Sequence, residues 1–119
     1  MLFRSPVAQQ PWCLDSGGFT ELSTYGRWTV ETADYVNAVR RYQSDIGNLV
    51  WAAPQDAMCE PWILDKAKNW LGGTVAAHQT WTVHNFLTLA ESGLPFIPVL
   101  QGWVPDDYLR HIEIGRAHV

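Results

Sequence analysis

Three short apolar runs stand out in the pattern of hydrophobic and polar positions, and they predict three β-strands. The runs span residues 11–15, 49–53 and 96–100, and they lack the alternation of a half-exposed strand. Uninterrupted apolar runs of this length are typical of strands that are buried on both faces of a parallel sheet. We therefore expect a buried parallel sheet at the centre of the fold.

Apolar positions at helical spacing predict two long helices between these strands. The first runs from Thr29 or Thr32, either of which can cap it, to Gly47, which stops it. The second begins after Thr74 and ends at residues 93–95, Gly-Leu-Pro. The apolar stripe of this second helix comprises Val75, Val83, Phe86, Leu87 and Ala90.

Three other segments complete the expected secondary structure. Residues 16–28 include two adjacent glycines and are expected to form a long loop. Residues 54–73 are expected to be irregular, with one helical turn near 64–70. A last helix is expected to start at Pro105, because two carboxylates follow in its first turn, where the helix dipole favours negative charge.

Strands that alternate with long helices predict an α/β fold made of βα units with parallel strands. Each predicted strand ends at a polar residue: Asp15 ends the first, Asp56 follows the second, and Gln101 follows the third. In parallel α/β folds the carboxyl ends of the strands form one rim, and ligands bind there. The pattern therefore predicts one site that is assembled from three loops.

Composition narrows the classes of function. A chain of 119 residues is one domain at most, and its net charge is −4. This charge balance lacks the basic footprint of a nucleic-acid-binding surface, so other parts of a protein would supply most phosphate contacts. No apolar run approaches the length of a membrane span, and the N-terminus has no signal-peptide run. We expect a cytoplasmic protein that does not contact membranes.

The distribution of cysteine and histidine argues against a metal site. Cys13 and Cys59 are far apart in sequence, form no Cys-x-x-Cys pair and are expected to be reduced thiols. His78 and His84 are six residues apart on the second predicted helix, so they do not share a face as a metal pair would. We expect no metal ligands in this segment.

The residue types at the strand ends suit the recognition of a flat heterocycle. A carboxylate such as Asp56 only accepts hydrogen bonds, whereas the Gln101 amide both donates and accepts them. Such a pair can bind a ring that has donors on one edge and a carbonyl on another, as guanine has. The ring of Phe19 can stack on the same heterocycle. Guanine and its relatives are therefore candidate ligands.

Each of these residues also has a simpler interpretation. Asp15 can cap its loop by accepting hydrogen bonds from nearby backbone N–H groups. Phe19 can be a core residue, and Gln101 can be a loop residue with a backbone contact. Cys59 can line the pocket beside Asp56 or be a packed thiol. The residues by themselves leave both interpretations open.

Three motifs resemble those of the tRNA-guanine transglycosylase superfamily. Its members carry an Asp-Ser-Gly-Gly-(Phe/Tyr)-Gln run, which residues 15–19 match and from which Thr20 departs. Asp56 followed by Cys59 is similar to a later Asp and Cys of that family, with one extra residue in the spacing. Residues 100–102, Leu-Gln-Gly, are similar to its Val-Gln-Gly segment. The residues around the first two motifs are most similar to the DNA-modifying branch, the deazapurine DNA modification protein A-like proteins.

The resemblance covers most of residues 11–110 and implies a partial (β/α)8 TIM barrel. It also implies a base-exchange reaction in which guanine leaves a nucleic-acid strand and a 7-deazaguanine is installed. Asp15 would be the acid/base or substrate-binding carboxylate of this reaction. The target base must leave the stack to reach such a pocket. The residues that the resemblance places around the base are Ser16, Gly17, Gly18, Phe19, Asp56, Cys59, Gln101 and Gly102.

The resemblance further implies that residues 1–112 are a fragment, about three βα units of an eight-unit barrel. The covalent nucleophile of the family, an Asp on a later strand, and its Cys/His zinc site would lie beyond residue 119. We therefore expect no cofactor in this segment and no turnover by the fragment. The expected partners are a purine or 7-deazapurine base, and DNA or tRNA through the full-length parent. Residues 113–119 resemble the translation of a sequencing-library adapter and are expected to be a non-native tail.

Two other functions fit the same residues. The chain can be a non-catalytic module that binds a nucleobase or completes a partner's barrel. It can also be part of an unrelated (β/α)8 hydrolase in which Asp15 and Asp56 are paired carboxylates.

Overall fold

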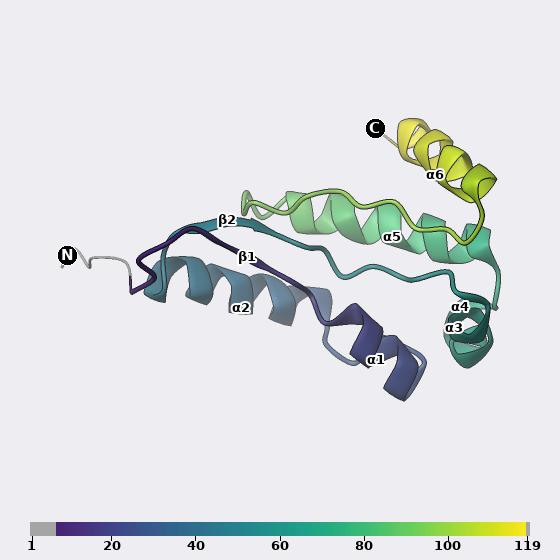
Figure 1. Cartoon of the computed structure of the whole chain (residues 1–119), viewed down its shortest axis with the longest axis horizontal. Coiled ribbons are helices and arrows are strands. Elements are labelled where there is room, and N and C mark those ends of the chain that lie inside the picture. The colour runs from purple at the N-terminus through teal and green to yellow at the C-terminus, as the bar shows by residue number, and fades with distance from the viewer. Residues whose placement is uncertain (1–6, 119) are drawn as a thin grey trace.

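The computed structural model describes residues 7–118, which form a mixed α/β arrangement (Figure 1). Residues 1–6 of the predicted barrel fragment and Val119 of the predicted tail lie outside the described residues. The elements in chain order are β1 (Trp12–Leu14), α1 (Gly18–Tyr25), α2 (Thr32–Asp45), β2 (Leu49–Ala52), α3 (Pro61–Lys66), α4 (Lys68–Leu71), α5 (Val75–Ala90) and α6 (Pro105–Ala117).

Two of the three predicted strands form a parallel sheet. Trp12 in β1 pairs with Leu49 in β2, and Leu14 pairs with Ala52. The third predicted strand, 96–100, is wrong in extent, because it contributes only a parallel bridge from Phe96 to Ala52. The Ala52 N–H donates to the Pro95 carbonyl at 2.9 Å, and the Ala52 carbonyl accepts from the Ile97 N–H at 3.2 Å. Pro98 follows directly and has no N–H with which to extend the ladder.

The sheet is covered on one side only, so the expectation of strands buried on both faces is wrong for the described residues. Helices α2 and α5 lie alongside the strands (Figure 1). On the other side Cys13 is exposed, and Val50 is 53% exposed. The core that forms between the sheet and the two helices comprises Tyr35, Val39, Leu49, Ala52, Leu89 and Phe96.

The two predicted long helices are confirmed, with one change of cap. Helix α2 begins after Glu31, and its Thr32 side chain donates to Asn85 Oδ1 at 2.7 Å instead of capping the helix. Helix α5 begins as predicted, because the Thr74 hydroxyl accepts from the Ala77 N–H at 3.1 Å. Gly47 follows α2 with a φ of 76°, a left-handed conformation that glycine adopts without strain.

The prediction of a loop at residues 16–28 is wrong, because α1 occupies its centre. Gly17 lies at the N-cap with a φ of 79°, and Gly26 ends the helix with a φ of 69°. The glycines therefore mark the two ends of a helix that is fixed by the burial of Leu22. Leu22 packs in a second cluster with Trp28, Ala57, Met58 and Ile63. The next segment also holds more helix than expected, since α3 and α4 replace a single turn.

The buried face of α5 is not the predicted apolar stripe. Val83, Phe86 and Leu87 are half-buried and line a groove beside α6. The buried residues of α5 are instead mostly polar: His78, Gln79, Thr82, Asn85 and Leu89. Buried polar side chains are tolerated where they find hydrogen-bond partners, and this face meets the backbone of two loops.

Helix α6 begins as predicted, at Pro105. The Asp107 carboxylate accepts from the N–H groups of Trp103 at 2.9 Å and Val104 at 3.1 Å, which fixes the turn that leads into the helix. The helix continues to Ala117 and so includes most of the predicted tail. Helical conformation does not distinguish native residues from added ones, so the tail remains a prediction.

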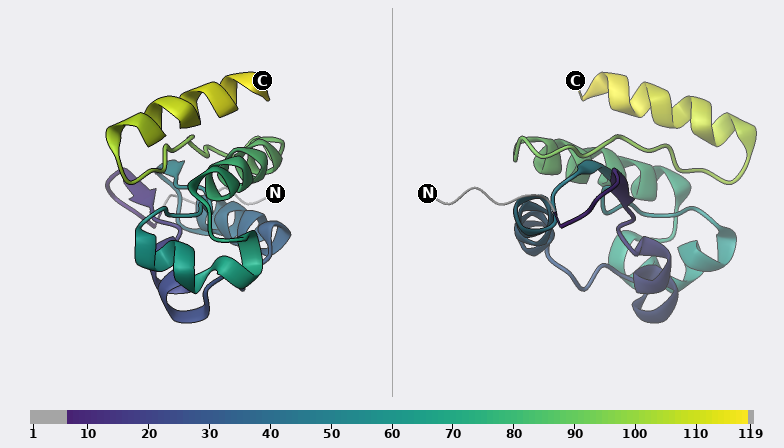
Figure 2. Two further views of the ribbon diagram at one scale, coloured as in Figure 1. Left: turned by 90° about the vertical axis from the view of Figure 1, so that its right-hand side faces the viewer. Right: turned by 60° about the vertical axis from the view of Figure 1, so that its left-hand side comes forward.

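The carboxyl ends of the strands point toward one end of the molecule, where α1, α3 and α4 lie together (Figures 1 and 2). Helix α1 packs on α3 at this end. None of the helices within residues 7–118 is long and apolar enough to cross a membrane.

Candidate base-recognition site

Asp56 and Gln101 are in direct contact, although they are 45 residues apart in sequence. Asp56 lies in the loop after β2, and Gln101 lies in the segment that follows the Phe96 bridge. The Gln101 side-chain nitrogen Nε2 donates to Asp56 Oδ2. The structure thus joins a carboxylate and an amide from two of the three predicted strand ends.

The first loop reaches the same place through Gly18. A Cβ atom on Gly18 would lie 2.8 Å from Trp28 Cζ2, 2.9 Å from Met58 Cε and 3.2 Å from Asp56 Oδ1. Real Cβ atoms do not approach other atoms at the two shorter distances, so only glycine fits here without rearrangement. The start of α1 therefore packs against the Asp56 carboxylate, and all three loops meet at this group.

The Asp56 carboxyl group has a raised pKa that is close to neutral pH. Burial disfavours the charged form and raises the pKa of Asp56 from 3.8 to about 6. The hydrogen bond from Gln101 acts in the opposite direction, while the negative charges of Asp15 and Glu60 raise the pKa further. A carboxyl group with such a pKa can both accept hydrogen bonds as a carboxylate and exchange a proton near pH 7.

The loop around Asp56 is held by side chains that bond to its backbone. Each of these side chains is buried or half-buried, and each comes from a different position outside the loop. Trp28 Nε1 donates to the Asp56 carbonyl at 2.7 Å, Asn85 Nδ2 donates to the Gln55 carbonyl at 2.9 Å, Thr82 Oγ1 accepts from the Ala57 N–H at 2.9 Å, and His78 Nδ1 lies 2.8 Å from the Met58 carbonyl.

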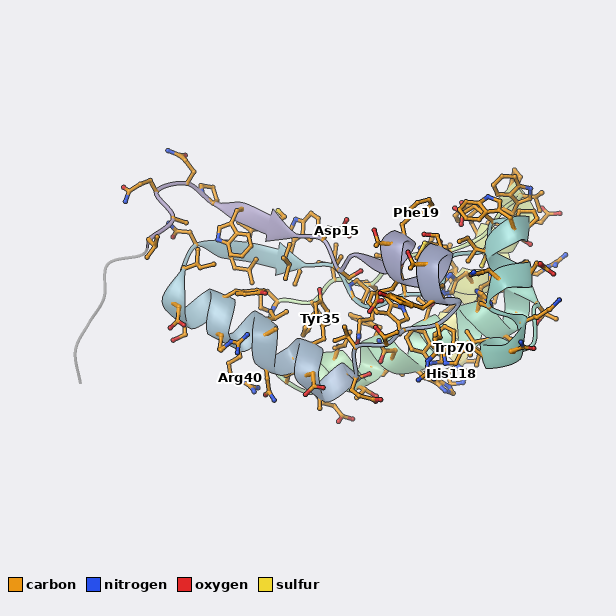
Figure 3. All side chains as sticks on the ribbon, turned by 90° about the horizontal axis from the view of Figure 1, so that it is seen from below. Asp15, Phe19, Tyr35, Arg40, Trp70 and His118 are labelled. Atoms are coloured by element: carbon orange, nitrogen blue, oxygen red, sulfur yellow. The ribbon has the colours of Figure 1, made fainter. Side chains whose placement is uncertain are left out.

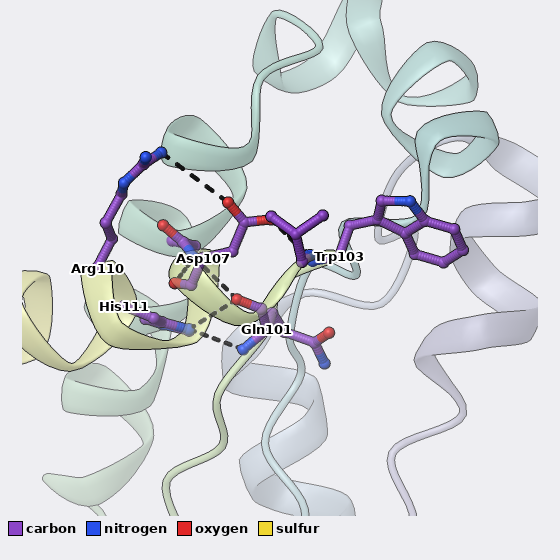
Figure 4. Close-up of polar contacts among 7 residues, drawn as sticks. Gln101, Trp103, Asp107, Arg110 and His111 are labelled. Carbon is purple, nitrogen blue, oxygen red and sulfur yellow. Dashed lines mark hydrogen bonds and ion pairs between the residues drawn. The ribbon is translucent and has the colours of Figure 1, made fainter.

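Both backbone polar groups of Gln101, its N–H and its carbonyl, form hydrogen bonds with side chains (Figure 4). Its N–H donates to His111 Nδ1 at 2.7 Å, and its carbonyl accepts from Gln79 Nε2 at 2.9 Å. Because Nδ1 of His111 accepts a hydrogen bond, the proton of this neutral ring lies on Nε2. Burial lowers the pKa of His111, which favours the neutral ring that this contact requires.

Asp15 and Phe19 lie at the rim rather than in the interior. Figure 3 shows Asp15 at the end of β1 and Phe19 in the first turn of α1. Asp15 is exposed, and its Oδ1 accepts from the Gly17 N–H at 3.5 Å. Phe19 is 57% exposed, and its ring contacts that of Trp62 edge to face, with 5.6 Å between the centroids. Trp62 is also more than half exposed, so both rings lie at the surface.

Two further predicted site residues, Ser16 and Gly102, are less accessible than Asp15 and Phe19. Ser16 is half-buried, and Gly102 is buried. A Cβ atom on Gly102 would lie 2.7 Å from the Cβ of Asp107, and the carbonyl of Gly102 accepts from the Tyr108 hydroxyl at 3.2 Å. Gly102 therefore lets the Gln101 loop pass close to the start of α6.

Cys59 is fully buried. Burial, followed by the charges of Asp107, Glu60 and Asp56, raises the pKa of Cys59 to about 12. The thiolate, which is the nucleophilic form, is therefore scarce at neutral pH. These surroundings favour a role for Cys59 in shaping the pocket beside Asp56 over a role as a nucleophile.

We expect only Cys13 to react rapidly with Ellman's reagent in the folded protein. Cys13 is exposed, whereas Cys59 is buried and protonated. Absorbance at neutral pH should report one fast thiol, and a second should appear only in denaturant. Cys13→Ser should remove the fast phase, and a fast phase that persists in this variant would contradict the assignment.

Within the described range of the chain, no group of three or more His, Cys, Asp or Glu side chains is arranged to hold a metal ion. The residues that reasoning from the sequence missed are instead those that hold the two loops. On α5 they are His78, Gln79, Thr82 and Asn85, whose spacing places them on one helix face. The helical spacing of these polar residues was visible in the sequence and could have identified this face.

A family model described as DpdA, DeoxyPurine in DNA protein A, matches residues 2–118. The comparisons with curated proteins and with solved structures found no match. The matched span contains Asp15, Asp56 and Gln101 with their loops. It confirms the resemblance to the deazapurine DNA modification branch of the tRNA-guanine transglycosylase superfamily. The chain belongs to the DpdA family, DeoxyPurine in DNA protein A.

Proposed function

We propose that the chain carries the base-recognition part of a transglycosylase that replaces guanine in DNA with a 7-deazaguanine. Membership of the DpdA family supports involvement in deazapurine modification of DNA. The observation that carries the finer proposal is the Asp56–Gln101 pair, which lies against Gly18 where a side chain would obstruct it.

The chemistry of the pair matches one edge of guanine. Guanine presents N–H donors beside the O6 carbonyl acceptor. The Asp56 carboxylate can accept from the ring and exocyclic N–H groups, and the Gln101 amide can donate to O6. The two side chains also bond to each other. Binding would therefore exchange one internal hydrogen bond for several to the ligand.

The rim residues complete the proposed pocket. The exposed Phe19 ring would stack on the base, and stacking on an aromatic ring contributes about 1–3 kcal/mol per base. Asp15, assisted by Ser16, would serve as the acid/base or substrate-binding carboxylate. The target base would be flipped out of the DNA stack to reach them.

The arrangement of the strands supports the proposal that the chain is part of a (β/α)8 barrel wall. The order β1, β2, Phe96 is parallel and sequential. Helices α2 and α5 cover one face, as barrel helices do. The exposed Cys13 and Val50 would then face the barrel interior.

Guanine binding to the 119-residue chain tests the proposal. In isothermal titration calorimetry, we expect guanine and 7-deazaguanine to bind and adenine to bind at least about tenfold more weakly, because its edge lacks the O6 carbonyl. Asp56→Ala and Gln101→Leu should each abolish the preference. Asp106→Ala, which removes an exposed carboxylate of α6, should leave it intact. Equal affinity for the two purines would overturn the proposal.

A further inference from the structure

We propose that Gln79 is a positioning residue that holds the amide of Gln101 against the Asp56 carboxylate. The inference rests on the proposed function, in which Asp56 and Gln101 bind the base together. Gln79 lies in α5, does not contact the proposed base edge, and acts through the backbone of the Gln101 loop.

Both protons of the Gln79 amide are used inside the protein. Gln79 is 1% exposed, and its Nε2 donates to the Gln101 carbonyl at 2.9 Å and to the Asp107 carbonyl at 2.7 Å. An amide nitrogen has two N–H donors, so no proton remains for another partner. The side chain thus ties the Gln101 loop to the first turn of α6.

The other side of the Gln101 backbone is fixed as well. The Gln101 N–H donates to His111 Nδ1, and the Asp107 carboxylate holds the N–H groups that follow Gly102. The side chain of Gln101 is then the only part of the residue that can change partner. This restriction suits a group that must exchange Asp56 for a ligand without moving its loop.

Helix α5 holds the loop of Asp56 on the same face. Thr82 accepts from the Ala57 N–H, and Asn85 donates to the Gln55 carbonyl, so Asp56 lies between two anchored peptide groups. Gln79 and Thr82 are three residues apart, which is about one turn of a helix. Because one rigid helix anchors both loops, it sets the separation of the carboxylate and the amide.

The polar character of this face points to the same role. An apolar face would pack against the loops without the cost of burying amides and hydroxyls. It would leave the loop carbonyls and N–H groups without partners, and the loops would be free to shift. The hydrogen bonds of Gln79, Thr82 and Asn85 fix the loop positions in addition to satisfying buried groups.

The test replaces Gln79 with methionine, which has similar length and no donor. Carbon-13 NMR of the Asp56 carboxyl group in the ligand-free 119-residue chain gives the readout. Gln101 holds the pKa of Asp56 down against burial, so misplacing its amide should raise that pKa. Gln101→Leu removes the amide and should show the full rise in the pKa of Asp56. Because Gln79 acts through that amide, the double variant Gln79→Met with Gln101→Leu should show no further rise. Asp15 and Glu60, the other charges that act on Asp56, are unchanged in every variant.

Two further variants separate positioning from stability. Leu89→Ala removes a buried core side chain of the same helix and should lower stability without changing the titration of Asp56. Gln79→Asn keeps an amide but is too short to reach both carbonyls, so it should give a smaller rise in the pKa of Asp56. It replaces Gln79→Met as the test if that variant does not fold. An unchanged Asp56 pKa in the Gln79 variants, or additive rises in the double variant, would overturn the inference.

Guanine affinity distinguishes this inference from the proposed function. Gln79→Met should weaken guanine binding by about tenfold, as expected when a hydrogen-bonding pair is displaced. If the parent chain binds no guanine but the Asp56 titration responds to Gln79, positioning stands and the proposed function fails. If the parent binds guanine and Gln79→Met changes neither titration nor affinity, the positioning role fails alone.

Discussion

Replacing Asp56 with asparagine is expected to stabilise the folded chain at neutral pH and to abolish guanine binding. Burial raises the pKa of Asp56 to about 6, from an ordinary value of 3.8. The charged form is therefore less favourable in the folded chain than in the unfolded chain. Asparagine keeps an oxygen that can accept the Gln101 hydrogen bond, but it carries no charge.

The pH dependence follows from the direction of this shift. Between pH 4 and 6 the folded parent binds more protons at Asp56 than the unfolded chain does, so its free energy of unfolding decreases as the pH rises. The free energy of unfolding of Asp56→Asn does not decrease in this way. Its excess over that of the parent should be absent below about pH 4, should grow up to pH 6 and should stay constant above that, at no more than about 3 kcal/mol.

Urea unfolding of the parent and the variant at pH 4, 6 and 8 measures this difference. Asp106→Asn is the matched control, because that carboxylate is exposed in the first turn of α6. Loss of its charge should cost no more than about 1 kcal/mol and should give no gain in stability at any of the three pH values. An advantage of Asp56→Asn that is the same at pH 4 and pH 8 would contradict the burial of an ionised carboxylate. Guanine titrations at pH 8 should show loss of binding in the same variant.

Replacing Gly18 with alanine is expected to destabilise the chain and to weaken guanine binding together. The added methyl group would overlap with Trp28 and Met58 and would press on the Asp56 carboxylate. Overpacking of this kind costs about 1–3 kcal/mol. Since the contact includes Asp56 itself, the displacement should reach the base-recognition pair.

Thermal unfolding and guanine titration of Gly18→Ala measure both effects. Gly115→Ala is the control, because a Cβ atom at Gly115 would meet nothing within 4 Å and the residue lies inside α6. Alanine there should stabilise the helix by about 0.5–1 kcal/mol and leave guanine affinity unchanged. If the two alanine variants behave alike, the close packing at Gly18 does not govern the site.

The first prediction describes a carboxylate that is unfavourable for folding, whereas the second describes a glycine that its surroundings require. The Asp56 carboxylate is half-buried near other negative charges, and both effects raise its pKa. Sites of this kind are retained where function requires them, and removing them commonly raises stability. The expected gain from Asp56→Asn, with loss of binding, is the measurable form of this trade-off.

Local signals in the sequence predicted the elements whose ends are chemically marked. The Thr74 cap and the Gly47 stop act within one helical turn, so they can be recognised without the fold. Helix α1 escaped prediction because its glycines lie at its ends and resemble a loop. Its helical form depends on Leu22 packing against residues of a distant segment. The third strand was overestimated because apolar composition does not show where pairing stops.

The sequence by itself determined the first two strands, the two long helices, the start of α6 and the family motifs, and it singled out Asp15, Asp56 and Gln101. Only the tertiary structure decided that Gln101 bonds to Asp56, that Gly18 packs against the same carboxylate, and that a polar face of α5 anchors both loops. The physical reason is distance along the chain. Periodicity and capping report contacts within a few residues, whereas the burial and hydrogen bonds that set the pKa of Asp56 join residues tens of positions apart.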